Sequence, residues 1–134
     1  METPVSPTVH AAALWVGLCL LLLLVLSVRV VRQRERHRVP IGDAGVPELL
    51  RARRAFGNAT EYVPAAIGAL ITLTLVGAPA PVIHGFGLVL FLGRIAHAWG
   101  ISVSAGPSIG RSAGTLLTWL AFLFAGALLL FYAI

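Results

Sequence analysis

The chain has no lysine and few charges of any kind. Charged residues make up 11% of its 134 residues, against about a quarter in an average soluble domain. Hydrophobic residues make up 58%, and apolar stretches of membrane-spanning length take up nearly the whole chain. A soluble enzyme with one membrane anchor is therefore excluded, because no part of the chain is left to build a soluble domain.

Cysteine and clustered metal ligands are equally scarce. The single Cys19 excludes a disulfide framework and a cysteine-cluster metal site. Glu61 and the four histidines show no ligand spacing, so we expect no bound metal. Eight of the ten arginines lie between Arg29 and Arg54, next to a hydrophobic run. This position is typical of a membrane flank that meets lipid headgroups, and we expect no nucleic-acid partner.

The apolar runs predict four transmembrane helices. A helical span needs roughly 20 apolar residues, and the first run contains AAALWVGLCLLLLLVL at 11–26. Segments rich in proline and glycine, at 39–48, 77–81 and 106–107, predict the connections. The expected fold is all-α, a single integral membrane domain built as a four-helix bundle. Its spans are predicted at about 9–31, 48–76, 82–102 and 110–133.

The arginines also predict an orientation in the membrane. They concentrate in the first connection, and Arg111 stands at the head of the fourth helix, whereas the 77–81 turn and both chain ends have none. Loops rich in arginine remain in the cytoplasm. The first and third connections are therefore expected in the cytoplasm, with both termini on the outer side.

The second helix carries an unusual polar stripe. At about 100° per residue, five polar side chains fall on one face, while Arg53 is predicted to point away. Ionisable groups inside a span are costly and indicate a functional site. In the simpler alternative, the arginine side chains extend to the membrane surface, and the charges of Arg54 and Glu61 loosely neutralise each other. The five are Arg51, Arg54, Asn58, Glu61 and Tyr62.

The third and fourth helices add four further polar candidates. Arg94 and His97 lie one turn apart, so Arg94 can pair with Glu61 across the bundle and His97 can be a packing residue. Arg111 can contact lipid phosphate, and Ser112 can cap the fourth helix. Taken together, arginines around one carboxylate favour a small anionic ligand that also carries an ammonium group.

Three segments then point to a family. RAFGNATEYVP (54–64), LGRIAHAWGIS (92–102) and IGRSAGTLLTWL (109–120) resemble three motifs of the MAPEG family, the membrane-associated proteins of eicosanoid and glutathione metabolism. The resemblance covers residues 29–134 and is nearest to short bacterial members similar to microsomal glutathione transferases.

The resemblance implies a homotrimer in the bacterial inner membrane, with glutathione as cosubstrate between neighbouring subunits at the cytoplasmic side. Arg111 would stabilise the thiolate, with Ser112 as a second donor, and a lipophilic electrophile would arrive from the bilayer. No metal or redox cofactor is implied. The remaining positions that the resemblance assigns to glutathione binding are Arg29 (reaching in from a neighbouring subunit), Arg54, Asn58, Glu61, Tyr62, Arg94 and His97. Arg51 is added as a binding candidate because it lies on the same polar stripe.

Two other functions compete with a glutathione transferase or peroxidase. The same family includes a non-catalytic lipid-presenting scaffold, but Arg111 together with the whole polar stripe of the second helix favours the enzyme. A small multidrug-type transporter needs an acidic residue in its first span, and residues 3–28 contain none. Eicosanoid-processing members carry a tyrosine where this chain has Ile101, which argues against a leukotriene or prostaglandin synthase.

Overall fold

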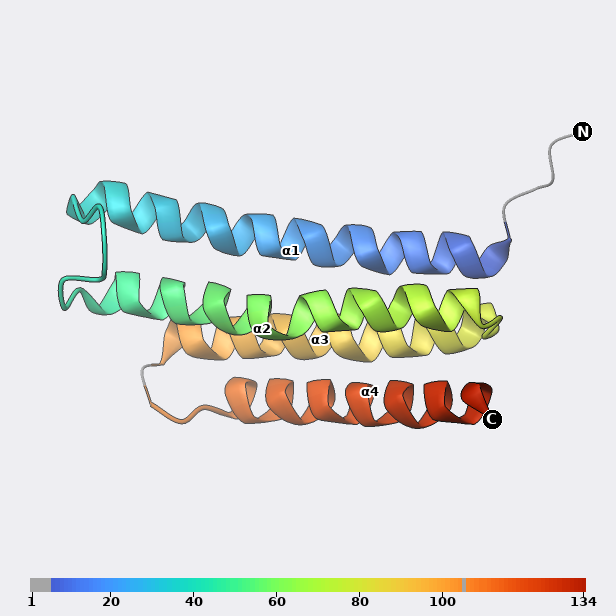
Figure 1. Cartoon of the computed structure of the whole chain (residues 1–134). Coiled ribbons are helices and arrows are strands. Elements are labelled where there is room, and N and C mark those ends of the chain that lie inside the picture. The colour runs from blue at the N-terminus through green and yellow to red at the C-terminus, as the bar shows by residue number, and fades with distance from the viewer. Residues whose placement is uncertain (1–5, 105) are drawn as a thin grey trace, which may run out of the picture.

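The computed structural model describes residues 6–104 and 106–134, and this part of the chain is all-α. Four long helices lie roughly side by side (Figure 1). The connections after α1 and after α3 lie at one end of the bundle, and the α2–α3 turn and the C-terminus lie at the other (Figure 1). The predicted all-α four-helix fold is confirmed. The helices are α1 (Pro7–His37), α2 (Pro47–Leu75), α3 (Ala80–Val103) and α4 (Ile109–Ala133).

Helix α1 continues past the predicted span and includes most of the first arginines. It ends at His37 and is capped by Arg38, which takes the left-handed conformation at φ 55° and donates its backbone N–H to the carbonyls of Arg34 and Glu35. Basic side chains in the last turn stabilise a helix C-terminus because they face its exposed carbonyl groups. The hydrophobic run therefore marks the apolar part of α1, and the helix extends beyond it.

Helix α2 differs from the other three in composition. Among the described residues, α1, α3 and α4 are long and apolar enough to cross a membrane by themselves. Helix α2 does not meet that measure, because its first half carries the arginines and the polar stripe. Its buried face consists mainly of alanine and leucine, which pack on α1 and α3. The polar helix is thus supported by apolar neighbours.

Helices α3 and α4 approach each other most closely, through glycines on both helices. A Cβ atom on Gly114 would lie 2.5 Å from the Gly93 carbonyl oxygen, and one on Gly100 would lie 2.5 Å from the Arg111 nitrogen. Real Cβ atoms do not approach backbone atoms so closely, so these positions require glycine. Small residues that let two backbones meet are typical of membrane helix pairs. This seam fixes the start of α4 against the end of α3.

The far half of the bundle, toward the α2–α3 turn, has a large apolar core. Trp15, Leu70, Ile83, Phe86 and Leu90 are almost fully buried there. Among the described residues, α1 packs on α2 and α3 and makes no contact with α4. Helices α2 and α3 therefore lie between α1 and α4 (Figure 1).

Candidate functional site

The polar stripe of α2 faces the beginning of α4. Arg54, Asn58 and Glu61 line a cavity of about 260 Å³ that Arg111 also lines. Arg51 and Arg54 line a second cavity, of about 170 Å³, and Arg111 again contributes to it. The structure thus brings three arginines, an amide and a carboxylate to one region.

The prediction that Arg53 points away from this face is wrong. Its side chain lines the same cavity as Asn58 and Glu61. Its Nη1 also contacts the Asp43 carboxylate at 3.2 Å, which draws the long side chain toward the α1–α2 connection. The angular position of a Cα atom did not determine where this flexible guanidinium lies.

Arg94 is the buried centre of the polar region, with 2% of its surface exposed. Its Nε donates to the Thr118 hydroxyl at 2.9 Å, and its Nη1 donates to the Asn58 Oδ1 at 2.7 Å. Its Nη2 donates to the Gly114 carbonyl at 3.4 Å. The guanidinium carbon lies 4.8 Å from the centre of the Tyr62 ring, within the range of a cation–π contact. One side chain on α3 therefore connects α2 to α4.

The expected pairing of Arg94 with Glu61 does not form. Across the described residues, Glu61 pairs with neither Arg94 nor Arg54; its Oε2 accepts a hydrogen bond from the Asn58 Nδ2 at 3.4 Å. Asn58 stands between the two charges, because an amide offers an acceptor to the arginine and a donor to the carboxylate. Glu61 itself is exposed, so its carboxylate remains accessible to a ligand.

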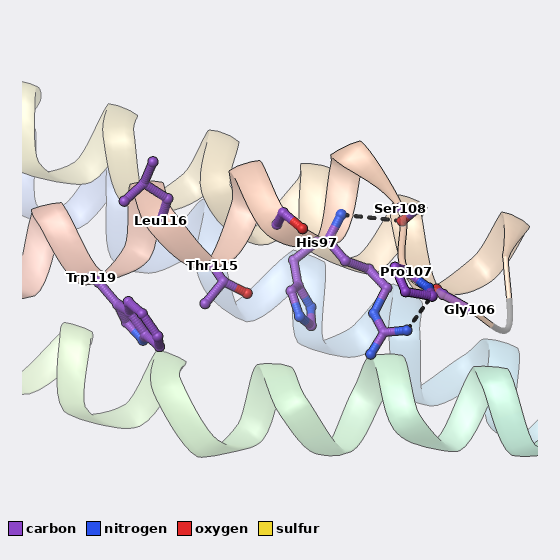
Figure 2. A pocket seen from close by; sticks show the side chains of 9 residues that line it. His97, Gly106, Pro107, Ser108, Thr115, Leu116 and Trp119 are labelled. Carbon is purple, nitrogen blue, oxygen red and sulfur yellow. Dashed lines mark hydrogen bonds between the residues drawn. The ribbon is translucent and has the colours of Figure 1, made fainter.

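Arg111 also lines a larger cavity, of about 620 Å³, together with His97, Ser112, Thr115 and Trp119. Figure 2 shows the rings of His97 and Trp119 and the Thr115 side chain on this wall. The Arg111 Nη1 donates to the Gly106 carbonyl at 2.8 Å. The other guanidinium donors form no further hydrogen bond among the described residues. Arg111 is the side chain that the three cavities share.

The N-terminal cap of α4 is Ser108, and not Ser112. The Ser108 hydroxyl accepts from the Arg111 backbone N–H at 3.3 Å and donates to the Gly100 carbonyl at 3.2 Å. Helix α4 begins at Ile109, so Ser112 lies inside the first turns. Ser112 is exposed and lines the 620 Å³ cavity, which leaves its hydroxyl available.

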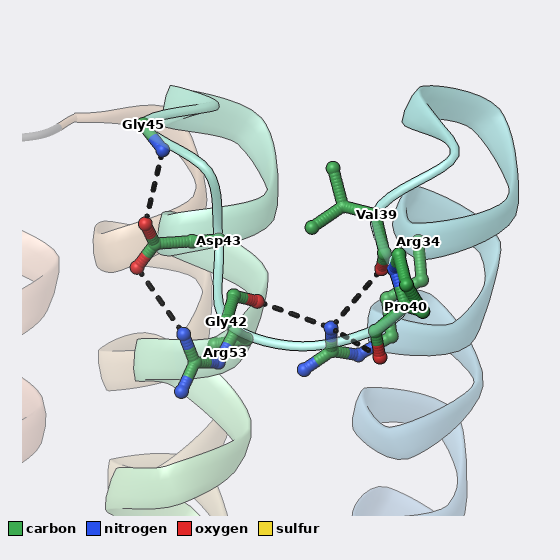
Figure 3. Close-up of polar contacts among 7 residues, drawn as sticks. All are labelled: Arg34, Val39, Pro40, Gly42, Asp43, Gly45 and Arg53. Atoms are coloured by element: carbon green, nitrogen blue, oxygen red, sulfur yellow. Dashed lines mark hydrogen bonds and ion pairs between the residues drawn. The ribbon is translucent and has the colours of Figure 1, made fainter.

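The arginines of α1 have separate roles. Arg34 donates from its Nη1 to three carbonyls of the α1–α2 connection, those of Val39, Pro40 and Gly42, at 3.0–3.2 Å (Figure 3). The Asp43 carboxylate accepts from the Gly45 N–H at 3.1 Å on the other side of this connection (Figure 3). Arg29 is exposed and lines none of the three cavities that Arg111 shares.

Thr118 was not among the predicted site residues. Its hydroxyl is fully buried and holds the Nε of Arg94. A threonine in an apolar helix usually bonds its own backbone, as Thr118 does to the Gly114 carbonyl at 2.8 Å. The one signal in the sequence was its spacing of one turn from Gly114, which places Thr118 on the face of α4 that packs against α3.

The comparisons with known proteins agree with these observations. The MAPEG family matches residues 12–131. The inner membrane protein YecN of Escherichia coli K12 is 43% identical over 89 residues, which cover 66% of this chain and 68% of YecN. YecN of Escherichia coli O6:H1 shows the same identity and coverage. Together with three membrane-spanning helices and a fourth that packs among them, these matches establish that the chain is an integral membrane protein that belongs to the MAPEG family.

Proposed function

We propose that this protein is a membrane glutathione S-transferase that activates the glutathione thiolate for attack on lipophilic electrophiles, with hydroperoxides as a second substrate class. The observation that carries the proposal is the position of Arg111. It lies where a cavity lined by Asn58 and Glu61 meets a larger cavity lined by Thr115 and Trp119. A guanidinium at this junction reaches a thiol held on one side and an electrophile on the other.

The polar cavities match the chemistry of glutathione, which carries two carboxylates and an ammonium group. Arg51 and Arg54 supply forked donors for carboxylates. Glu61, oriented by Asn58, supplies an acceptor for the ammonium group. In this proposal Tyr62, Arg94 and His97 form the inner wall behind the peptide.

In the homotrimer that we propose, Arg29 completes this site from a neighbouring subunit. Its side chain is exposed and contributes to none of the cavities that Arg111 shares within its own chain. An arginine in this position suits a ligand that is bound at the site of a neighbouring subunit.

The chemistry requires a deprotonated thiol. A free thiol has a pKa near 8.5 and is mostly protonated at neutral pH, whereas the thiolate is the nucleophile. The positive charge of Arg111 favours the anion, and each unit of thiol pKa corresponds to about 1.4 kcal/mol. The sulfur then forms a bond to the electrophilic carbon, the leaving group departs with its electron pair, and the thiol proton passes to water. In this proposal Ser112, which lines the same cavity as Arg111, donates a second hydrogen bond to the sulfur.

The proposed location is the bacterial inner membrane, where YecN is named as residing. The arginine-rich end of α1, the arginine-rich start of α2 and the α3–α4 connection lie at the same end of the bundle (Figure 1). By the positive-inside rule this end faces the cytoplasm, which contains the thiol. Both termini then lie outside.

Ile101 narrows the substrate class. It lines both smaller cavities next to Arg111, at the position where eicosanoid-processing relatives carry tyrosine. An aliphatic side chain gives no hydrogen bond to the peptide or to an eicosanoid. We therefore propose general lipophilic electrophiles rather than a leukotriene or prostaglandin precursor.

The test is ultraviolet difference absorbance of the detergent-purified protein titrated with glutathione. We expect a saturable thiolate band in the wild type and none in Arg111→Ala, whose transferase turnover should fall by about 100-fold or more. Arg36→Ala is the matched control, because Arg36 is exposed and lies in the last turn of α1. An undiminished band in Arg111→Ala would remove the role assigned to this arginine.

A non-catalytic lipid-binding scaffold is the second candidate. An apolar groove of about 580 Å³ between α3 and α4, lined by Val82, Phe86, Val89, Leu120 and Phe124, favours it because the groove suits an acyl chain. The same titration discriminates between the two functions. A wild type that binds glutathione without a thiolate band, or does not bind it, would support the scaffold.

A further inference from the structure

Thr118 is a buried hydroxyl in the apolar run of α4. None of its surface is exposed, and both of its hydrogen bonds are internal. The hydroxyl donates to the Gly114 carbonyl at 2.8 Å and accepts from the Arg94 Nε at 2.9 Å. Because its proton is used on its own helix, the lone pair that faces α3 can serve only as an acceptor for Arg94.

The Arg94 guanidinium is planar, so acceptors on several of its edges determine its orientation. Thr118 holds the Nε edge and the Gly114 carbonyl holds Nη2. The remaining group, Nη1, is thereby directed at Asn58, 2.7 Å from Oδ1. The Tyr62 ring covers one face of the guanidinium.

This geometry determines which way the Asn58 amide points. A guanidinium only donates, so Asn58 must turn its carbonyl oxygen toward Arg94. Its Nδ2 group then faces Glu61 and the cavity that Arg111 shares. A reversed amide would place two N–H donors against a cation and an oxygen beside the Glu61 carboxylate, and both contacts would be repulsive.

We propose that Thr118 is a positioning residue of the glutathione site, acting through Arg94 on the Asn58 amide. The inference rests on the proposed function and adds a residue that touches neither ligand nor sulfur. The proposal predicts different effects on glutathione binding and on the thiol pKa. Loss of the Thr118 hydroxyl should weaken glutathione binding, whereas the thiol pKa, which Arg111 sets, should stay constant.

The test uses Thr118→Val, which keeps the branched shape and removes the acceptor, with Thr118→Ser as the matched control that keeps the hydroxyl. The amplitude of the thiolate band against glutathione concentration gives Kd, and its pH dependence gives the pKa of the bound thiol. We expect Kd to rise by about five- to tenfold in Thr118→Val. Thr118→Ser should restore a near wild-type Kd, and the thiol pKa should be the same in all three proteins.

A double-mutant cycle separates positioning from a general packing defect. In an Asn58→Ala background no amide remains to be oriented, so Thr118→Val should raise Kd no further. If Thr118→Val does not yield folded protein, Thr118→Ala removes the same acceptor with less volume and enters the same cycle. Thermal unfolding in detergent identifies the folded variants.

The outcomes are distinct. A wild type with no saturable binding would overturn the proposed function and this inference with it. A wild type that binds, beside a Thr118→Val protein with unchanged Kd, would overturn the inference alone. Equal loss of binding in Thr118→Ser and Thr118→Val, or an additive cycle with Asn58→Ala, would assign Thr118 to packing and not to positioning.

Discussion

The two halves of the bundle differ in what lies between their helices. Toward the α2–α3 turn, the interior consists of large apolar side chains such as Trp15, Leu70 and Phe86. Toward the α1–α2 and α3–α4 connections, the interior holds the buried polar residues Arg94 and Thr118 and a smaller apolar cluster that includes Ala55, Ala59 and Ala98. The apolar half stabilises the helices against one another, and the polar half leaves room for a ligand. The function that we propose therefore separates stability and binding along the length of the same four helices.

The strongest test of this separation is to create a cavity in the apolar half by truncating one buried side chain. Phe86→Ala removes the largest fully buried side chain, and such truncations cost about 3–5 kcal/mol. We expect a marked fall in the unfolding temperature in detergent, with an unchanged glutathione Kd in the protein that remains folded. If Phe86→Ala changed the glutathione Kd as much as Asn58→Ala does, the two halves of the bundle would be coupled.

A smaller effect is expected from the same substitution at two glycines of α4. In Gly114→Ala the new Cβ would lie 2.5 Å from the Gly93 oxygen and the His97 nitrogen. Such overpacking costs about 1–3 kcal/mol. A Cβ on Gly126 would meet no atom within 4 Å, so Gly126→Ala should be neutral or slightly stabilising. Equal unfolding temperatures for both variants would contradict the tight seam.

The smallest effect concerns a polar contact of the apolar half. The Trp15 Nε1 donates to the His84 Nδ1 at 3.1 Å. His84→Leu leaves the indole N–H without its partner, at a cost of about 1 kcal/mol in the free energy of unfolding. His84→Gln keeps an acceptor and is the control. Glutathione binding should not change in either variant, and a lost thiolate band in His84→Leu would place His84 in the functional half.

The sequence predicted the helices well, because long apolar runs leave few alternatives to membrane-spanning helices. The predicted bounds of α2, α3 and α4 differ from those observed by only a few residues. Helix α1 is longer than the span predicted at 9–31, since hydropathy measures the apolar layer and not the whole helix. Its last turns, with Arg34 and Arg36, extend beyond the hydrophobic run and are stabilised by their own capping.

The contacts within the site were less predictable. Charge alone favoured a pair between Arg94 and Glu61, and the sequence could not show that Asn58 would stand between them. The cap of α4 depends on the backbone conformation at the start of the helix. That conformation makes Ser108, and not Ser112, the N-cap. Thr118 could not be distinguished from other threonines, because its role comes from a residue 24 positions away on another helix.

The Arg94 network has a consequence for how the chain enters the membrane during synthesis. An arginine at the centre of a lone span raises the cost of insertion by about 2.5–3.5 kcal/mol. Asn58 lies 36 residues earlier, so one partner is already present when α3 leaves the ribosome. Thr118 follows 24 residues later and closes the network only when α4 arrives. The order of the helices along the chain therefore gives the charged span a polar companion from the start.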